Sequence, residues 1–136
     1  MELLMNNHQS LKAEIDAVYI PLPNSLHREW TIRALEAGKA VLCEKPFTLN
    51  AREAQAVIDT ARRQKRFLME AMWTRCFPLM AKLRSLLSSQ AMGEVHLLTA
   101  DFGFRAEYHE EQRLFDRAVG GGALLVLPLH DQRGRV

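Results

Sequence analysis

Three short segments, each directly after an apolar run, hold the side chains of this sequence that could do chemistry. They cover residues 21–25, 44–47 and 70–75, and His27 lies in the first turn of the helix expected after the first of them. If the apolar runs are parallel strands, their carboxyl ends meet at one edge of a sheet, where α/β proteins bind their ligands. We therefore expect one site that contains Asn24, His27, Glu44, Lys45, Trp73 and Arg75.

Lys45 is the leading candidate for a catalytic group. It follows the apolar run 40–43, stands beside Glu44 and precedes Pro46, which restricts Lys45 to extended backbone. A lysine held partly out of water can exchange a proton near neutrality, or stay charged and polarise a hydroxyl or carbonyl group. Taken alone, the tripeptide more often marks a surface Lys–Glu pair at the end of a strand.

The other candidates have structural interpretations as well. His27 is isolated and could be a solvated or capping side chain, and Trp73 could pack between domains or form a substrate wall. Arg75 could bind a phosphate, or pair with Glu70 or a carbonyl group. Cys43 lies inside an apolar run, so we expect a core residue and no nucleophile. The histidines are scattered without metal-ligand spacing, and we expect no metal site.

The elements that must position these residues follow from the pattern of apolar residues. Residues 16–20, 40–43 and 67–71 predict buried strands, and residues 26–37 and 51–65 predict helices. Strands that alternate with helices across short loops are typical of a parallel sheet with crossover helices. The fold class expected is therefore α/β, built on a parallel sheet.

The two helices show recognisable ends and faces. Asn24 or Ser25 could cap the first helix, whose apolar face would hold Leu26, Trp30, Ala34 and Ala37, and Gly38 suits its C-terminal end. Asn50 and Glu53 resemble a capping box for the second helix. The apolar face of that helix would consist of Ala54, Val57, Ile58 and Ala61.

After Ala71 the pattern changes. We expect a helix over residues 78–87, a polar connection over 88–93 and a longer strand over 95–104. The glycine triplet at 120–122 lacks the spacing of a dinucleotide fingerprint, and no Gly-x-Gly-x-x-Gly occurs in the sequence.

Composition excludes several classes of protein. The 136 residues are 48% hydrophobic and 25% charged with a net charge of +2, which suits a globular protein and gives no reason to expect nucleic acid binding. No apolar run is long enough for a membrane span, and the first residues do not resemble a signal peptide. Two cysteines make no disulfide framework, so we expect a cytoplasmic protein with reduced thiols.

Taken together, the motifs resemble the Gfo/Idh/MocA oxidoreductases, and within them the dihydrodiol and xylose-type sugar dehydrogenase branch. The segments that carry the resemblance are Ala17–His27, Ala37–Lys39, Val41–Pro46, Met69–Arg75, Arg113–Asp116 and Gly120–Leu125. The resemblance implies an NAD- or NADP-dependent dehydrogenase for a sugar, polyol or trans-dihydrodiol, with a possible homo-oligomer. The alternative is an inactive remnant or a subunit-interaction fragment of such an enzyme.

The resemblance also implies roles for individual residues. Lys45 would be catalytic, beside the nicotinamide and the substrate hydroxyl, and Glu44 would position it. The cofactor would lie along Leu22, Pro23, Asn24, His27, Glu44, Lys45, Pro46, Trp73 and Arg75.

The same resemblance suggests domain limits and shows departures from the family pattern. Residues 1–75 would hold the second half of a Rossmann-like parallel sheet, as a partial dinucleotide-binding domain without the glycine unit. Residues 76–125 would be the start of an α/β C-terminal domain for substrate binding and oligomerisation. Residues 126–136 read as a divergent tail, in which Val126 replaces an expected acid and His130 matches no catalytic position.

Overall fold

The computed structural model describes residues 14–97, 99, 107, 109 and 114–122. Packing divides the chain into two compact units, which are described separately. The first contains the described residues up to Ala71 and those from His109 onward, and the second contains those from Met72 to Glu107. The domain limits expected from the sequence, after residues 75 and 125, stay a prediction.

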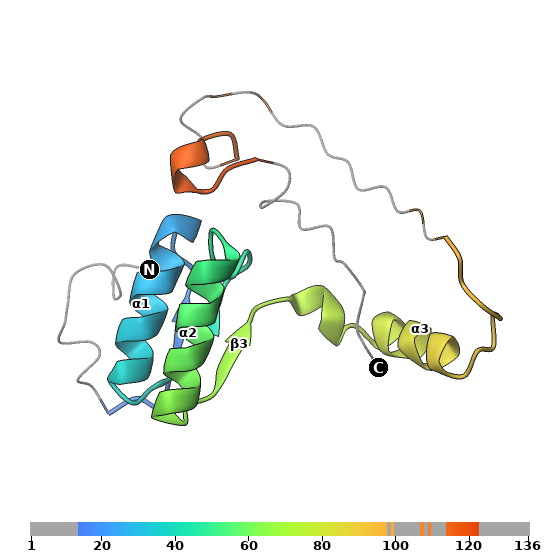
Figure 1. Ribbon diagram of the computed structural model, residues 1–136, viewed down its shortest axis with the longest axis horizontal. Coiled ribbons are helices and arrows are strands. Elements are labelled where there is room, and N and C mark those ends of the chain that lie inside the picture. The colour runs from blue at the N-terminus through green and yellow to red at the C-terminus, as the bar shows by residue number, and fades with distance from the viewer. Residues whose placement is uncertain (1–13, 98, 100–106, 108, 110–113, 123–136) are drawn as a thin grey trace. The chain divides into compact units, whose positions relative to one another are not determined.

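The first unit is built on a parallel sheet, as the sequence predicts. Strands β1 (Ala17–Ile20), β2 (Ala40–Cys43) and β3 (Leu68–Glu70) lie in the order β1-β2-β3. Helix α1 (Asn24–Glu36) connects β1 to β2, and helix α2 (Ala51–Gln64) connects β2 to β3. The two helices lie side by side in Figure 1, on the face of the sheet that carries the core. The predicted α/β alternation is therefore confirmed.

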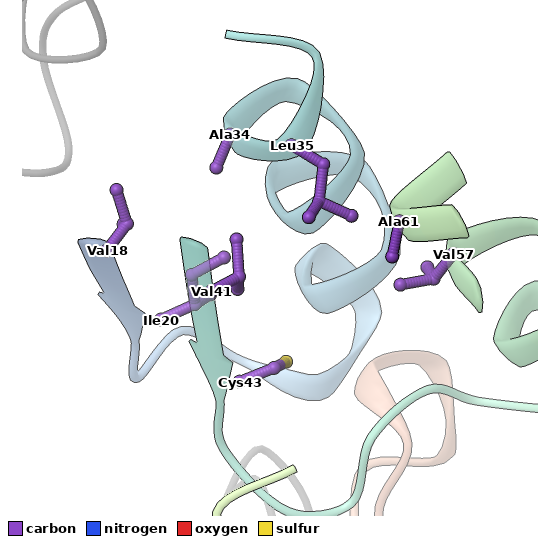
Figure 2. Packing of buried hydrophobic residues seen from close by; sticks show 8 residues of the cluster. All are labelled: Val18, Ile20, Ala34, Leu35, Val41, Cys43, Val57 and Ala61. Carbon is purple, nitrogen blue, oxygen red and sulfur yellow. The ribbon is translucent and has the colours of Figure 1, made fainter. Parts of the chain in front are cut away.

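The core fills the space between the sheet and the two helices. Alternate residues of a strand point to opposite faces, so every second side chain of β1 and β2 reaches the helices. Figure 2 shows these side chains directed towards α1 and α2. The buried cluster consists of Val18, Ile20, Ala34, Leu35, Val41, Cys43, Val57 and Ala61.

Helix α1 differs from its prediction at the N-terminus and on its buried face. The N-cap is Pro23, no side chain caps the helix, and Asn24 is its first residue. Ala37 lies beyond the helix and is exposed. The buried face instead begins with three polar residues and consists of Asn24, His27, Thr31, Ala34 and Leu35. Gly38 ends the connection with a φ of +78°, in the left-handed conformation expected of it.

Helix α2 begins as its sequence predicts. The side chain of Asn50 accepts a hydrogen bond from the Glu53 N–H at 3.0 Å. The Glu53 carboxylate in turn accepts from the N–H of Leu49 at 3.1 Å, one residue earlier than in the usual capping box. These bonds satisfy two N–H groups that the helix itself cannot.

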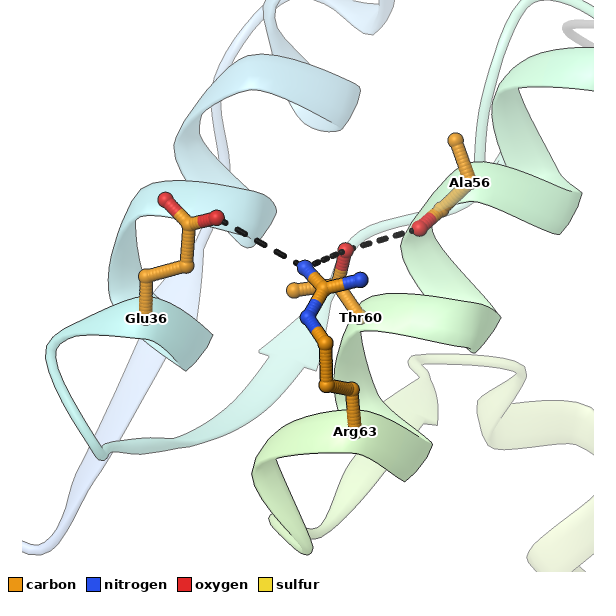
Figure 3. A network of polar contacts seen from close by, with 4 residues as sticks. All are labelled: Glu36, Ala56, Thr60 and Arg63. Atoms are coloured by element: carbon orange, nitrogen blue, oxygen red, sulfur yellow. Dashed lines mark hydrogen bonds and ion pairs between the residues drawn. The ribbon is translucent and has the colours of Figure 1, made fainter.

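A small polar network joins the ends of α1 and α2 (Figure 3). The Arg63 guanidinium lies 3.7 Å from the Glu36 carboxylate and donates to the Thr60 hydroxyl at 3.2 Å. That hydroxyl donates to the carbonyl oxygen of Ala56 at 2.9 Å. Because Glu36 and Arg63 are both more than half exposed, the ion pair contributes little to stability.

The second unit holds a short 3-10 helix, η2 (Trp73–Cys76), and helix α3 (Pro78–Ser88), which begins with proline. The predicted helix over 78–87 is thus confirmed. Of the strand predicted over 95–104, the described residues 95–97 and 99 belong to no strand, and the others lie outside the described residues. None of the helices in the described part of the chain is long and apolar enough to cross a membrane.

Candidate cofactor and active site

The three predicted site loops leave the sheet at a common edge. Ile20, Cys43 and Glu70 are the last residues of their strands and are register partners. The N–H of Glu44 donates to the Ile20 carbonyl at 3.0 Å, and the N–H of Ala71 donates to the Cys43 carbonyl at 2.7 Å. This is the carboxyl edge of a parallel sheet, where such folds bind ligands.

His27 joins two of these loops from the inside. Its side chain is 0% exposed. Nδ1 lies 2.8 Å from the Pro46 carbonyl oxygen, and Nε2 lies 2.7 Å from the Leu22 carbonyl oxygen. Each ring nitrogen thus lies within hydrogen-bond distance of a backbone carbonyl oxygen, one in each loop. The loop after β1 and the loop after β2 are therefore held by one side chain of α1.

Asn24 is buried at the start of α1 and reaches a distant part of the chain. It is 5% exposed, and its Nδ2 donates to the carbonyl oxygen of Gly120 at 3.1 Å. The preceding Leu22 is half-buried and Pro23 is exposed. Leu22 and Pro23 in this predicted cofactor loop therefore have apolar side chains that are at least partly accessible to solvent.

The carboxylate of Glu44 has a partner on each oxygen. Oε1 accepts from the Tyr19 hydroxyl at 2.6 Å, and Oε2 accepts from the N–H of Lys45 at 3.0 Å. The hydrogen bond to Glu44 raises the pKa of Tyr19, and desolvation and the negative charge of Glu44 act in the same direction. Glu44 therefore fixes the backbone at Lys45.

The loop that carries Lys45 is tied at three points. Besides the bonds of Glu44 and His27, the N–H of Phe47 donates to the Glu70 carboxylate at 2.9 Å. The peptide bond between Lys45 and Pro46 is cis. The side chains of Lys45 and Pro46 are half-buried. Lys45 is thus presented at the carboxyl edge by a loop whose backbone is held by three neighbouring side chains.

Cys43 lies beneath this loop as an inert thiol. It is 0% exposed, and its Sγ lies 3.9 Å from the carbonyl oxygen of Phe47. Burial raises the pKa of Cys43 to about 11, and the negative charges of Glu70 and Glu44 add to the effect. A thiol that stays protonated is a poor nucleophile, as the sequence predicts for this residue.

Trp73 and Arg75 belong to the second unit, on helix η2. The Trp73 ring is 57% exposed and meets the Phe77 ring edge-on, with 5.1 Å between the ring centres. Arg75 is exposed, and its carbonyl oxygen accepts from Arg84 at 3.2 Å. The other seven predicted site residues all lie in the first unit: Leu22, Pro23, Asn24, His27, Glu44, Lys45 and Pro46.

Sequence reasoning missed three contributors to this site. In the sequence, Tyr19 is an ordinary strand residue and Glu70 is a possible partner of Arg75. Gly120 belongs to a glycine triplet that makes a poor phosphate loop. Their roles depend on hydrogen bonds between residues far apart in the sequence, which no local sequence pattern predicts. Within the described ranges, no three His, Cys, Asp or Glu side chains are grouped as a metal ion would require.

A parallel sheet with helical crossovers and converging strand-end loops defines a Rossmann-type nucleotide-binding domain. The family model described as an oxidoreductase family with an NAD-binding Rossmann fold, Gfo/Idh/MocA, matches residues 2–72. The chain belongs to this family, as its motifs predict.

Individual relatives agree with the family assignment. The chain is 42% identical over 112 residues to a trans-1,2-dihydrobenzene-1,2-diol dehydrogenase of Xenopus tropicalis, covering 82% of this chain and 33% of that protein. It is 40% identical over 124 residues to a D-xylose 1-dehydrogenase (NADP(+)) of Hypocrea jecorina, covering 85% and 32%. The crystal structure of aldose-aldose oxidoreductase from Caulobacter crescentus, complexed with glycerol, matches with a TM-score of 0.79 and 34% identity, covering 86% and 35%. The chain thus spans about a third of the length of these proteins.

Proposed function

We propose that this chain supplies the nicotinamide side of the active site in an NAD- or NADP-dependent dehydrogenase. Its substrate would carry the hydroxyl group of a sugar, a polyol or a trans-dihydrodiol. The observation that carries the proposal is the presentation of Lys45, half-buried on a loop tied at three points, where three parallel strands end. The names of the relatives support this class of substrate.

The chemistry of the loops fits a nicotinamide nucleotide. Leu22 and Pro23 offer apolar contact to the faces of a ring or ribose, and Lys45 offers a cationic donor. Both nitrogens of His27 already contact carbonyl groups of the protein. His27 would therefore act through the loops and make no direct contact with the cofactor. When bound, the nicotinamide supplies the hydride acceptor or donor.

Lys45 would act on the substrate oxygen. Its amino group would hold the hydroxyl by a hydrogen bond and take up or return the hydroxyl proton as the carbonyl group forms or disappears. Glu44 would keep Lys45 in place through the backbone bond at 3.0 Å. Trp73 and Arg75 are exposed in the second unit, and their expected contact with the cofactor stays a prediction.

Calorimetric titration tests the proposal directly. Because the sequence has no Gly-x-Gly-x-x-Gly unit for the pyrophosphate, contacts to the nicotinamide half should dominate binding. We expect NADP+ or NAD+ to bind the full chain, and nicotinamide mononucleotide to compete for the same site. Adenosine diphosphate should not compete. If neither dinucleotide binds at millimolar concentration, the proposed function is wrong.

A second function, association with other subunits without catalysis, is favoured by one observation. Tyr19, Leu42 and Met69 are register partners on the sheet face opposite the core, and they are 45%, 37% and 40% exposed. A row of exposed apolar side chains across a sheet favours protein contacts. Light scattering of the purified chain measures its oligomeric state. Stable oligomers that bind no dinucleotide would support this alternative. A homo-oligomer that binds the cofactor would support the first proposal.

The cysteines support the expected compartment. Cys43 is free and buried, and Cys76 is free and exposed. An exposed free thiol is typical of proteins kept in a reducing environment. We therefore retain a cytoplasmic location as part of the proposal.

A further inference from the structure

The glycine triplet that the proposed function leaves unused makes a specific contact with the first site loop. The Nδ2 group of Asn24 donates to the carbonyl oxygen of Gly120 at 3.1 Å, across 96 residues of sequence. Both residues are buried. Asn24 directly follows Leu22 and Pro23, so this contact lies at the end of the loop proposed to meet the cofactor.

A side chain at position 120 would be strained and would have to displace its neighbours. Its φ is +85°, and a Cβ atom there would lie 2.5 Å from Cδ2 of Leu49 and 3.1 Å from Cβ of Asn24. Gly122 has a φ of +112° but no atom within 4 Å of a Cβ. The two glycines thus share a conformation that other residues rarely adopt, and only Gly120 is also enclosed by neighbours.

The segment around Gly120 is held by its own hydrogen bonds. The Asp116 carboxylate accepts a hydrogen bond from the N–H of Ala118 at 2.8 Å. The backbone carbonyl oxygen of Asp116 accepts from the N–H of Gly121 at 2.7 Å. The N–H of Gly122 donates to the Leu114 carbonyl at 2.8 Å. Residues 114–122 therefore present the Gly120 carbonyl from a folded loop.

We propose that Asn24 and Gly120 are positioning residues, through which residues 114–122 set the loop 21–24 and so the affinity for the cofactor. His27 holds this loop at the Leu22 carbonyl, and Gly120 holds it at Asn24. Neither Asn24 nor Gly120 needs to contact the dinucleotide. The link to cofactor affinity rests on the function proposed above.

Hydrogen exchange of the full chain without cofactor tests the contact itself. Gly120→Ala should speed the exchange of the Leu26 amide, which donates to the Pro23 carbonyl at 2.8 Å, while the amides of β2 keep their protection. Gly122→Ala is the matched control, because it also places a Cβ at a positive φ but in open space, and it should leave the Leu26 amide unchanged. Equal effects of the two substitutions, or no effect of Gly120→Ala, would overturn the proposal.

A double-mutant cycle tests the effect on binding. Asn24→Asp keeps the shape of the side chain but replaces the donor with an oxygen that faces the Gly120 carbonyl. We expect Asn24→Asp and Gly120→Ala each to weaken dinucleotide binding about three- to tenfold, as expected for the loss of one hydrogen bond. The affinity of the double variant for the dinucleotide should be no lower than that of the single variant with the lower affinity. If the fold-losses in affinity of the two single variants multiply in the double variant, the residues act separately and the proposal is overturned. If the wild-type chain binds no dinucleotide, the proposed function fails, and the exchange experiment still decides the contact.

Discussion

The Nδ1 atom of His27 lies 2.8 Å from the carbonyl oxygen of Pro46, 19 residues further along the chain. Through this contact, helix α1 holds the loop that carries Lys45. The same ring holds the Leu22 carbonyl at 2.7 Å, so two loops depend on one side chain.

Replacing His27 should therefore destabilise the first unit. His27→Ala would remove a fully buried side chain and its contacts with the Leu22 and Pro46 carbonyl groups, and we expect the free energy of unfolding to fall by roughly 2–5 kcal/mol. His27→Gln keeps an N–H₂ donor and should lose less. Urea denaturation followed by circular dichroism measures both variants. A loss below about 0.5 kcal/mol for His27→Ala, the range of neutral surface changes, would contradict the role of the ring.

Lys45 should matter for the reaction and little for stability. Lys45→Met keeps the length of the side chain but removes the group that handles the substrate proton, so we expect the rate of hydride transfer to fall roughly 10²- to 10⁴-fold. Single-turnover reduction of the dinucleotide, with the sugar or diol that the wild-type chain oxidises, gives this rate. Lys82→Met, at an exposed position of α3, is the control. Equal rates in the two variants would exclude Lys45 as the catalytic group.

The buried thiol of Cys43 should make stability fall in alkaline solution. Its pKa in the folded chain is about 11, above the ordinary value of 9.0, because burial disfavours the thiolate. The stabilisation is fully present below pH 9 and is lost as the pH rises towards 11, by about 2–3 kcal/mol in all. The free energy of unfolding, measured from about pH 9 to pH 11, should change less with pH in Cys43→Ala than in the wild type. The variant retains every other titrating group. Parallel profiles for wild type and variant would contradict the assignment.

The ionisation of Tyr19 should report on Glu44. The hydrogen bond from the Tyr19 hydroxyl to Glu44 raises the pKa of Tyr19 above 10.0, and Glu44→Gln removes the negative charge that disfavours the phenolate. We therefore expect Tyr19 to ionise at a lower pH in this variant. The ultraviolet absorbance of tyrosinate measures the shift in a Tyr108→Phe background, where Tyr19 is the only tyrosine. Glu94→Gln, at an exposed position, should not move the titration.

The elements that present Lys45 could be predicted because their signals are local. Four consecutive residues, Ala40–Cys43, form a strand that stops at Glu44-Lys45-Pro46. Asn50 and Glu53 mark the start of α2, and their spacing alone indicates the bond from the Glu53 N–H to the Asn50 side chain. Parallel order then follows from the helical connections, which bring the strand ends to one edge.

The contacts that hold the loops could not be predicted in this way. Asn24 has the chemistry of an N-cap, but its side chain turns to Gly120, which local spacing cannot reveal. In the sequence His27 is an isolated polar residue, because its partners are backbone carbonyls, which every residue carries. Partners of this kind become known only when the packing of distant segments is known.

The polar inner face of α1 limits where the helix can sit. A displacement by one helical turn, about 5.4 Å, would separate the His27 ring from both carbonyls and Asn24 from Gly120. An apolar inner face would accept several such displacements at little cost, because dispersion contacts are not directional. The helix thus has one energetically acceptable registration on the sheet. Leucine at positions 24 and 27 would yield a more hydrophobic chain with several competing packings, visible as broadened side-chain resonances in nuclear magnetic resonance spectra.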